Sequence, residues 1–181
     1  REDFLEEAMR SVLESTFQDF ELIVVDDASS DRTYEIAKEV AKTDERVQVV
    51  RNEKNLGQFG NRDYAASLAK GQYLKYLDSD DIIYPHGLGL MVSAMETYPE
   101  AGLGLASNTI DEMQPFPIFS NPRQAYFKHF LQQGYMTCGP SGSLIRTDVF
   151  KAVGGYGSKC YVGCDVLLWL KISALYPVVK F

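Results

Sequence analysis

Two hydrophobic periods alternate along the chain and predict helices and strands in turn. Apolar residues at helical spacing predict helices over 3–13, 32–42, 58–69, 86–97, 124–132 and about 165–175. Short apolar runs predict strands over 20–25, 46–51, 72–77, 102–107 and 142–146. This alternation is typical of an α/β protein with a mostly parallel central sheet.

Two segments interrupt the alternation. Residues 110–122 carry three prolines, which predicts an irregular insertion or active-site loop. Residues 154–163 are rich in glycine and predict a second loop.

Composition narrows the class of protein. With 181 residues, of which 45% are hydrophobic, the chain is long enough for one globular domain with a sizeable core. A formal charge of -7 argues against nucleic acid or an anionic membrane as the main partner. No run of about 18 apolar residues occurs, so no membrane span is predicted within the chain.

Cysteines and histidines give little support to a metal centre or a histidine-based catalytic triad. Cys138, Cys160 and Cys164 lack paired metal-ligand spacing, which predicts free thiols in a reducing, cytoplasmic compartment. Oxidation of the pair Cys160 and Cys164, or metal binding by it, is the alternative. His86 and His129 lie far apart in the sequence.

Acidic residues follow two of the predicted strands. Asp78, Asp80 and Asp81 come directly after strand 72–77, and Asp26 and Asp27 end strand 20–25. Parallel strands present ligands at their carboxyl ends, so we expect both groups at one edge of the sheet. Carboxylates crowded in a turn suit a hard divalent ion completed by water and substrate phosphates. Capped turns are the alternative, and Asp31 is expected to cap the next helix.

A set of motifs covers nearly the whole chain in order. They are residues 20–33, Asn55-Leu56-Gly57, Arg62-Asp63 and 71–81, with weaker matches at 141–146, 153–156 and 165–171. Together they resemble glycosyltransferase family 2 on the GT-A fold, a Rossmann-like, mostly parallel sheet with helices on both faces. The family pattern has Asn after the arginine, so Asp63 is a departure.

The resemblance implies a nucleotide and metal site. Asp80, with Asp78 beside it, would hold Mn²⁺ or Mg²⁺ as a Lewis acid at the donor diphosphate. The residues implied at the nucleotide are Asp26, Asp27, Asn55, Arg62 and Asp78. Turn formation remains the alternative for the two strand-end aspartates, and helix capping remains the alternative for Asn55.

The resemblance also implies an acceptor site and a catalytic base. Asp165 matches the second member of an acidic pair and would accept the proton of the acceptor hydroxyl. Cys164 stands where the family has Glu, which puts acceptor binding in doubt. Gly155, Tyr156 and Asp81 are expected in the loops around the acceptor. Helix capping is the alternative for Asp165, and core packing is expected for Trp169.

We further expect residues 1–181 to be a single GT-A domain that lacks its central first strand and its natural end, because the family begins with a strand before the first helix. The implied reaction is inverting transfer from a nucleotide diphosphate sugar, with UDP favoured, to an acceptor hydroxyl on a glycan, a lipid-linked sugar or another molecule. Such enzymes serve polysaccharide biosynthesis in the cytoplasm, some of them at the inner face of the membrane. A catalytically degenerate binding module and a receiver-type phosphoacceptor domain are the alternatives.

Overall fold

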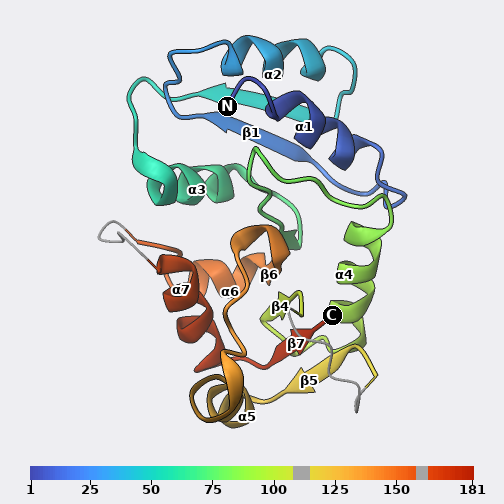
Figure 1. Cartoon of the computed structure of the whole chain (residues 1–181), viewed down its shortest axis with the longest axis vertical. Helices are drawn as coiled ribbons and strands as arrows, with labels where there is room; N and C mark the ends of the chain where they lie inside the picture. Colours follow the sequence, from blue (N-terminus) through green and yellow to red (C-terminus); the bar gives the residue numbers. More distant parts are fainter. Residues whose placement is uncertain (108–114, 158–162) are drawn as a thin grey trace. The chain divides into compact units, whose positions relative to one another are not determined.

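The structure is a computed structural model that describes residues 1–107, 115–157 and 163–181. Its contacts divide the chain into two compact units, shown in Figure 1. Unit 1 comprises residues 1–71 and 77–89, and unit 2 comprises residues 72–76 and 90–181.

Unit 1 is a two-stranded parallel sheet with helices packed against it. Its elements are α1 (Leu5–Leu13), β1 (Leu22–Asp26), α2 (Thr33–Ala41), β2 (Val47–Arg51) and α3 (Gly57–Leu68). The strands pair from Leu22 with Val47 to Asp26 with Arg51. Apolar residues at helical spacing on α1 and α2 meet the sheet, and the buried core consists of Leu5, Met9, Ala37, Val40 and Val47.

Unit 2 is built on a five-stranded sheet in the order β3-β6-β4-β7-β5. Its strands are β3 (Tyr73–Leu74), β4 (Leu103–Leu105), β5 (Ile118–Ser120), β6 (Ser143–Arg146) and β7 (Val178–Lys180). β4 and β7 are parallel, whereas β3 with β6, β4 with β6 and β5 with β7 are antiparallel. β4 and β7 are buried along their whole length.

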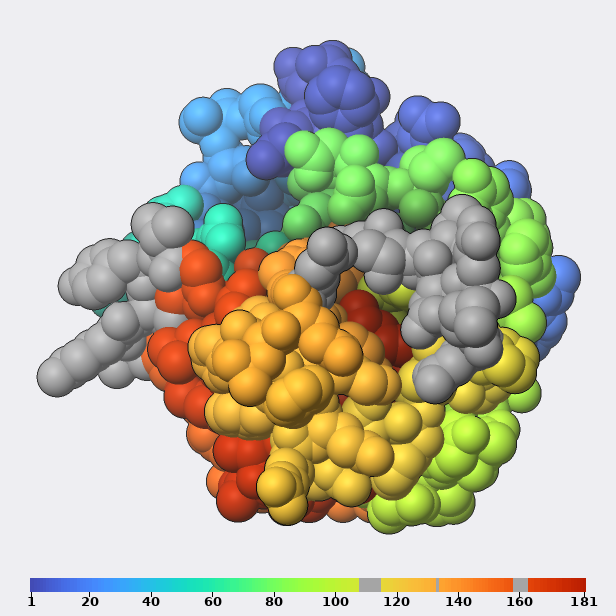
Figure 2. All heavy atoms as spheres, turned by 60° about the horizontal axis from the view of Figure 1, so that its bottom comes forward, coloured from blue at the N-terminus to red at the C-terminus, as the bar shows by residue number. Residues whose placement is uncertain are grey.

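The helices of unit 2 complete its core. They are α5 (Pro122–Phe127), the π-helix η1 (Lys128–Gln133), the 3-10 helix η2 (Pro140–Gly142), α6 (Thr147–Ala152) and α7 (Cys164–Ser173). α4 (Gly87–Thr97) has residues in both units. Trp169 of α7 is fully buried and donates from Nε1 to the Cys138 carbonyl at 2.8 Å, which confirms its predicted core position. Atoms of α5 and η1, yellow to orange in Figure 2, stand uncovered at the face shown there.

The predicted α/β class is confirmed, with local corrections. The strand predicted over 72–77 spans only Tyr73–Leu74, because the Lys75 ammonium donates to the carbonyls of Tyr76 and Ser141 and the chain leaves the sheet there. Although the run 20–25 is apolar, as in a buried strand, only Asp26 of β1 is buried, and β1 pairs with β2 alone among the described strands. The pattern did not predict β5 or β7.

Two further predictions have an outcome in the fold. Cys138 is a free, buried thiol, but Cys164 is disulfide-bonded, so the prediction of free thiols is wrong at Cys164. Cys160 lies outside the described residues. None of the helices in the described part of the chain has the length and apolar character that crossing a bilayer requires.

Candidate functional site

Asp26 ends β1 with a buried carboxylate. Its side chain is 1% exposed, and Oδ2 lies 3.2 Å from the Arg51 Nε and accepts a hydrogen bond from the Ser29 amide. Among the residues that the structure describes, Oδ1 is buried and has no hydrogen-bond partner. A buried carboxylate oxygen without a donor is costly, so Oδ1 is an unsatisfied acceptor at the end of the strand.

Asp27, the next residue, is already engaged within the protein. Oδ1 accepts hydrogen bonds from Asn52 Nδ2 and the Leu56 amide, both at 2.8 Å, and Oδ2 accepts one from the Gly57 amide at 3.0 Å. These amides belong to the first turn of α3 and the residue before it, where helix N–H groups lack internal partners. Asp27 therefore caps α3 from a distant point in the sequence.

Asn55 belongs to the same turn. Its Nδ2 donates to the Asp27 carbonyl at 3.0 Å, and its Oδ1 accepts from the Gly57 amide at 3.0 Å. Both contacts favour the capping interpretation, and its predicted contact with a nucleotide stays a prediction.

Arg62 on α3 pairs with Asp78 across the interior of unit 1. Nη2 lies 2.5 Å from Asp78 Oδ1, with the Arg62 side chain 15% and the Asp78 side chain 39% exposed. The guanidinium also lies over the Phe59 ring, 5.7 Å from its centroid. The pair brings together two residues predicted at the nucleotide.

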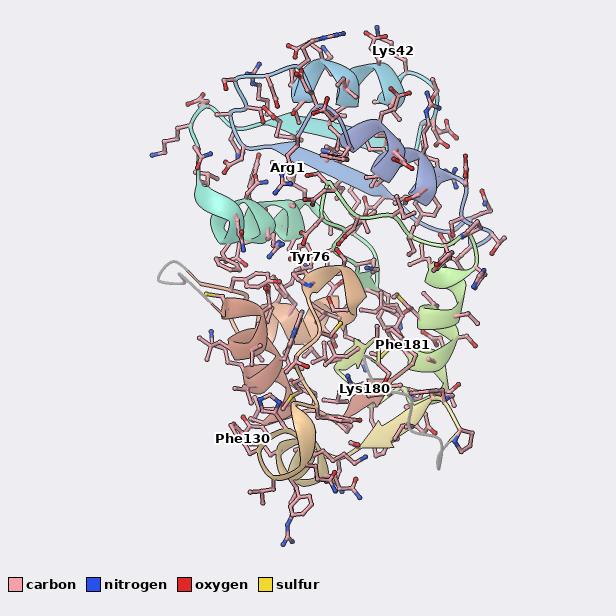
Figure 3. The ribbon with its side chains drawn as sticks, in the orientation of Figure 1. Arg1, Lys42, Tyr76, Phe130, Lys180 and Phe181 are labelled. Atoms are coloured by element: carbon pink, nitrogen blue, oxygen red, sulfur yellow. The ribbon has the colours of Figure 1, made fainter. Side chains whose placement is uncertain are left out.

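The acidic turn after β3 is compact. The Asp81 amide donates to the Asp78 carbonyl at 2.9 Å, and the Asp80 carboxylate accepts a hydrogen bond from the Arg1 guanidinium. Arg1 is labelled in Figure 3. The sequence predicted that these acids bind a divalent cation. In the structure each of the two proposed metal ligands lies beside an arginine, Asp80 beside Arg1 and Asp78 beside Arg62.

This donor set fits a divalent ion only in part. Within residues 1–107, 115–157 and 163–181, no group of three or more His, Cys, Asp or Glu side chains is arranged to hold a metal. Mg²⁺ and Mn²⁺ are, however, commonly held by one or two carboxylates, with water and substrate phosphates completing the coordination. Asp78 and Asp80 supply hard oxygen ligands on one exposed turn, so they suit an ion that binds together with a phosphate ligand.

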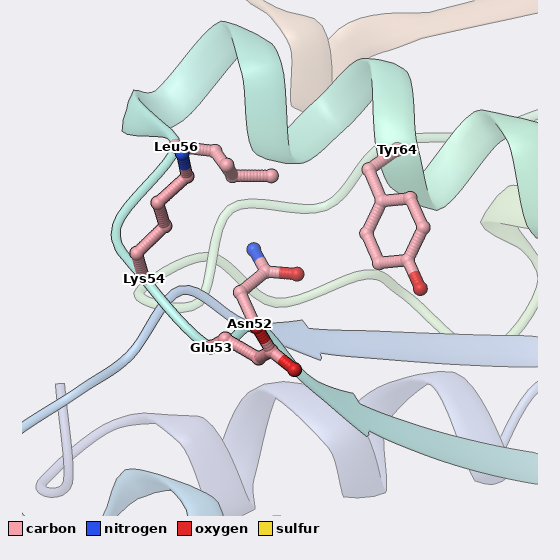
Figure 4. Close-up of a pocket in the computed structure, with 5 residues that line it drawn as sticks. All are labelled: Asn52, Glu53, Lys54, Leu56 and Tyr64. Carbon is pink, nitrogen blue, oxygen red and sulfur yellow. The ribbon is translucent and has the colours of Figure 1, made fainter.

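An open pocket of about 220 Å³ lies in unit 1 between the end of β2 and α3, as Figure 4 shows. Its lining residues are Asn52, Glu53, Lys54, Leu56 and Tyr64. Asn52 joins this pocket to the strand ends, because its Nδ2 also donates to Asn61 Oδ1 at 2.9 Å and Asn61 Nδ2 donates to the Val25 carbonyl at 2.9 Å.

Sequence reasoning missed Arg51, Asn52 and Asn61. The register that pairs Asp26 with Arg51 follows from two predicted strands ending at the same edge, so the sequence held a signal for Arg51. Asn52 and Asn61 become visible only when β2 and α3 are placed together in space.

In unit 2, Asp165 lies in the first turn of α7 and is half-buried. Gly163, with φ of 73°, is the N-cap residue of α7, so Asp165 is not the N-cap. Cys164, at the position of the family's Glu, is 3% exposed and disulfide-bonded, so it offers neither a carboxylate nor a free thiol.

The glycine-rich loop after α6 packs inward. Gly155 has φ of 59°, and Tyr156 is 3% exposed, with its ring centroid 5.9 Å from that of Tyr76 and 6.1 Å from that of Phe150. Tyr156 is therefore a core residue here, and contact of Gly155 or Tyr156 with an acceptor stays a prediction. Residues 158–162 of this loop lie outside the described residues.

Comparisons with known protein sequences agree on one family. The profile described as Glycosyl transferase family 2 matches residues 1–154. An uncharacterized glycosyltransferase of Methanocaldococcus jannaschii is 28% identical over 96% of this chain and 61% of its own length. The Escherichia coli enzyme WfaP, a UDP-Glc:α-D-GlcNAc-diphosphoundecaprenol β-1,3-glucosyltransferase, is 32% identical over 94% of this chain and 65% of its own length. The chain thus spans somewhat under two thirds of these relatives.

Solved structures share the fold. TarS from S. aureus, residues 1–349, aligns with a TM-score of 0.79 at 21% identity, over 99% of this chain and 54% of that one. The Pyrobaculum calidifontis mannosyltransferase PcManGT, solved with GDP-Man and Mn²⁺, aligns with a TM-score of 0.76 at 18% identity, over 100% of this chain and 51% of that one. At these identities the likeness concerns the fold.

Proposed function

We propose that this chain, which belongs to glycosyl transferase family 2, is the donor-binding and catalytic region of an inverting, hexosyltransferase-like enzyme. The reaction transfers a sugar from a nucleotide diphosphate sugar, with a UDP-sugar favoured, to an acceptor hydroxyl in a single displacement. The activity of WfaP, a UDP-Glc-dependent glucosyltransferase, supports this donor, and a TarS structure in complex with UDP-GlcNAc supports it as well. Family membership argues against the receiver-type alternative.

The observation that carries the proposal is the unpartnered Oδ1 of Asp26. Uracil carries an N–H that a buried carboxylate oxygen can accept, and a hydrogen bond to a charged group is worth about 1.5–3 kcal/mol. We therefore propose that the Asp26 carboxylate binds the uracil ring of the nucleotide. Asp27 and Asn55 support it indirectly by fixing the loop before α3.

Asp80, with Asp78, holds Mn²⁺ or Mg²⁺ in this proposal. When bound, the divalent ion neutralises the charge that develops on the leaving diphosphate. A solved relative in fold, PcManGT, contains Mn²⁺ with GDP-Man, which supports a metal-dependent site. Arg62, held beside Asp78, is the cation of unit 1 assigned to the nucleotide.

Asp165 is the proposed base that takes the proton of the acceptor hydroxyl. Asp165 lies in the first turn of α7. We propose that the acceptor is a glycan or a lipid-linked sugar, which the diphosphoundecaprenol-linked substrate of WfaP supports. We further propose that the enzyme serves polysaccharide biosynthesis in the cytoplasm or peripherally at the inner face of the membrane. Gly155, Tyr156 and Asp81 stay assigned to the surroundings of the acceptor.

Calorimetric titration with UDP, in the presence and absence of Mn²⁺, tests the nucleotide site. We expect Mn²⁺ to strengthen UDP binding to the wild type, Asp80→Ala to remove the effect of the metal, and Asp26→Asn to weaken binding about tenfold or more under both conditions. Equal titrations with GDP, CDP and dTDP establish the base preference.

Asp19→Ala is the matched control, because Asp19 is an exposed acid of unit 1 outside the site. It should bind UDP as the wild type does. Unchanged UDP affinity in Asp26→Asn contradicts the base assignment, and unchanged metal dependence in Asp80→Ala contradicts the metal assignment. Donor hydrolysis by the wild type then separates a working transferase from a degenerate binding module.

A further inference from the structure

One long stretch of unit 2 reverses the charge balance of the chain. Residues 113–147 contain Arg123, Lys128 and Arg146 but no Asp or Glu, and Arg146 forms an ion pair with Asp148 just after this stretch, which leaves Arg123 and Lys128 as its excess positive charge. The chain as a whole carries a formal charge of -7. Such a local excess of cations indicates a partner that is anionic.

The same stretch exposes large apolar side chains. On α5 and η1, Phe127 is 52%, Phe130 62% and Leu131 71% exposed. Phe127 ends α5, and Phe130 and Leu131 follow in the π-helix η1. Figure 3 labels Phe130 on this segment, and Figure 2 shows the segment without cover from other described elements. We call Arg123, Phe127, Lys128, Phe130 and Leu131 the α5–η1 face.

The α5–η1 face is held in place by contacts on its other side. Asn121 and Gln124 form a reciprocal capping box at the start of α5, and Ala125 is fully buried. The Tyr126 hydroxyl donates to the Leu170 carbonyl of α7 at 2.8 Å. The exposed phenylalanines therefore sit on an anchored helix, and their exposure does not result from a frayed segment.

The cations of this face have no acidic partner. Neither Arg123 nor Lys128 forms an ion pair within the described part of the chain. Lys128 instead donates to Ser120 Oγ at 3.0 Å and lies 5.1 Å from the centroid of the Tyr135 ring. Lys180, nearly buried, lies at the same distance from that ring and donates to the Ala106 carbonyl. Arg123 is thus the exposed cation of this face, Lys128 is half-buried at its base, and Lys180 adds a buried positive charge beneath it.

We propose that the α5–η1 face docks on an anionic lipid bilayer. Aromatic and leucine side chains beside lysine and arginine are the composition of helices that lie in the plane of a membrane interface, where apolar groups enter the headgroup region and cations meet anionic lipids. Because the rest of the chain carries net negative charge, an anionic bilayer repels the other surfaces of the protein. The difference in charge therefore orients the α5–η1 face toward the bilayer. The total charge of the chain argued against an anionic membrane as its main partner, but this one face can still bind such a membrane.

This inference rests on the peripheral membrane placement in the proposed function and adds the face that makes the contact, while vesicle binding itself requires neither donor nor acceptor. If the acceptor is lipid-linked, as proposed above, docking also brings the enzyme to the surface on which that acceptor lies. The two ideas can fail separately.

Co-sedimentation with vesicles tests the docking. The wild-type chain should sediment with vesicles of phosphatidylglycerol and phosphatidylcholine in equal parts, much less with phosphatidylcholine alone, and less as salt is added. The triple variant Phe127→Ser, Phe130→Ser, Leu131→Ser should lose about tenfold or more in partitioning. Arg123→Gln combined with Lys128→Gln should lose about fivefold for each cation removed.

Two control variants have matched exposure or charge. Leu90→Ser removes an apolar side chain that is 61% exposed on α4, and Lys42→Glu reverses an exposed cation of unit 1. Both should sediment with vesicles as the wild type does. UDP titration of every variant shows that the fold and the nucleotide site are intact, so loss of vesicle binding with normal UDP binding supports docking on its own.

The opposite results overturn the proposal. Absence of wild-type binding to phosphatidylglycerol vesicles, equal binding to neutral vesicles, or equal losses in the Leu90→Ser control each contradict an anionic bilayer as the partner of this face. Retained vesicle binding in the triple variant places the membrane contact elsewhere and contradicts it as well.

Discussion

The two compact units rest on different interactions. In unit 2, β4, β7 and most of β6 are buried, and Trp169, Leu103 and Ile145 lie in an apolar interior. In unit 1 the residues of β1 before Asp26 are only half-buried, and the loops after both strands are joined by side chains such as Asp27 and Asn52. Unit 2 gains its stability mainly from apolar burial, and unit 1 depends more on polar contacts at the edge of its sheet.

Substitutions in the two units should therefore change different properties, stability in unit 2 and ligand binding in unit 1. Buried apolar residues respond to substitution through cavities, which lower the free energy of unfolding. Polar networks at strand ends hold loops in position, so their loss first changes the ligand site. Three substitutions and one change of pH separate these two behaviours.

Trp169→Ala should be the most damaging change to stability. Trp169 is fully buried, and its Nε1 hydrogen bond to the Cys138 carbonyl would be lost together with its packing. We expect a loss of about 3–5 kcal/mol in the free energy of unfolding, measured by urea denaturation. Trp169→Phe, which keeps most of the apolar volume, should lose clearly less. Equal stability of Trp169→Ala and the wild type would show that apolar burial does not dominate in unit 2.

Asp165→Asn should separate chemistry from stability within unit 2. The amide keeps the shape of the side chain but is not basic, so the rate of sugar transfer should fall by roughly 10²–10⁴-fold while UDP affinity stays unchanged. Because Gly163 and not Asp165 is the N-cap residue of α7, the substitution removes no N-cap. Near-normal turnover in this variant assigns the base to another residue.

Asp27→Ala tests the polar network of unit 1. Three hydrogen bonds from Asn52, Leu56 and Gly57 to the carboxylate would be lost, so we expect unit 1 to lose about 2 kcal/mol. Amide hydrogen exchange should accelerate at Leu56 and Gly57 and stay unchanged in β4 and β7. Unaltered protection at the start of α3 would contradict the capping role.

Mild acid should produce the smallest effect, through His129 in η1. Burial lowers the pKa of His129 below its ordinary value of 6.5, and its Nδ1 accepts a hydrogen bond from the Met136 amide. The unfolded chain therefore binds more protons just below pH 6.5, so the stability due to this group is present above that pH and declines as the pH falls through the lower folded-state pKa. Urea midpoints of the wild type should fall relative to those of His129→Gln on acidification. A constant difference between the two proteins would contradict this titration.

Local pattern was enough to predict much of unit 1. The β-branched runs in β1 and β2 and the apolar spacing in α1 and α2 depend on neighbours in the sequence, and Asp26 at a strand end follows from them. What Asp27 does could not be predicted, because its donors come from residues 25 to 30 positions further along.

Unit 2 was harder to predict because distant segments decide its elements. β3 ends early where Lys75 donates to the carbonyl of Ser141, 66 positions away. Tyr156 has the residue type of a sugar-stacking ring, but its contacts with Tyr76 and Phe150 bury it. The short strands β5 and β7 pair with each other across about sixty residues, so neither carries a strong local signal.

The pair between Arg62 and Asp78 has a thermodynamic consequence. If Asp78 helps to hold the divalent ion as proposed, one carboxylate would serve both the ion and the guanidinium 2.5 Å away. Arg62, which is assigned to the nucleotide, would then share its partner with the ion. Metal and nucleotide would be linked through one side-chain pair, and linkage is reciprocal: the factor by which Mn²⁺ tightens UDP binding equals the factor by which UDP tightens Mn²⁺ binding.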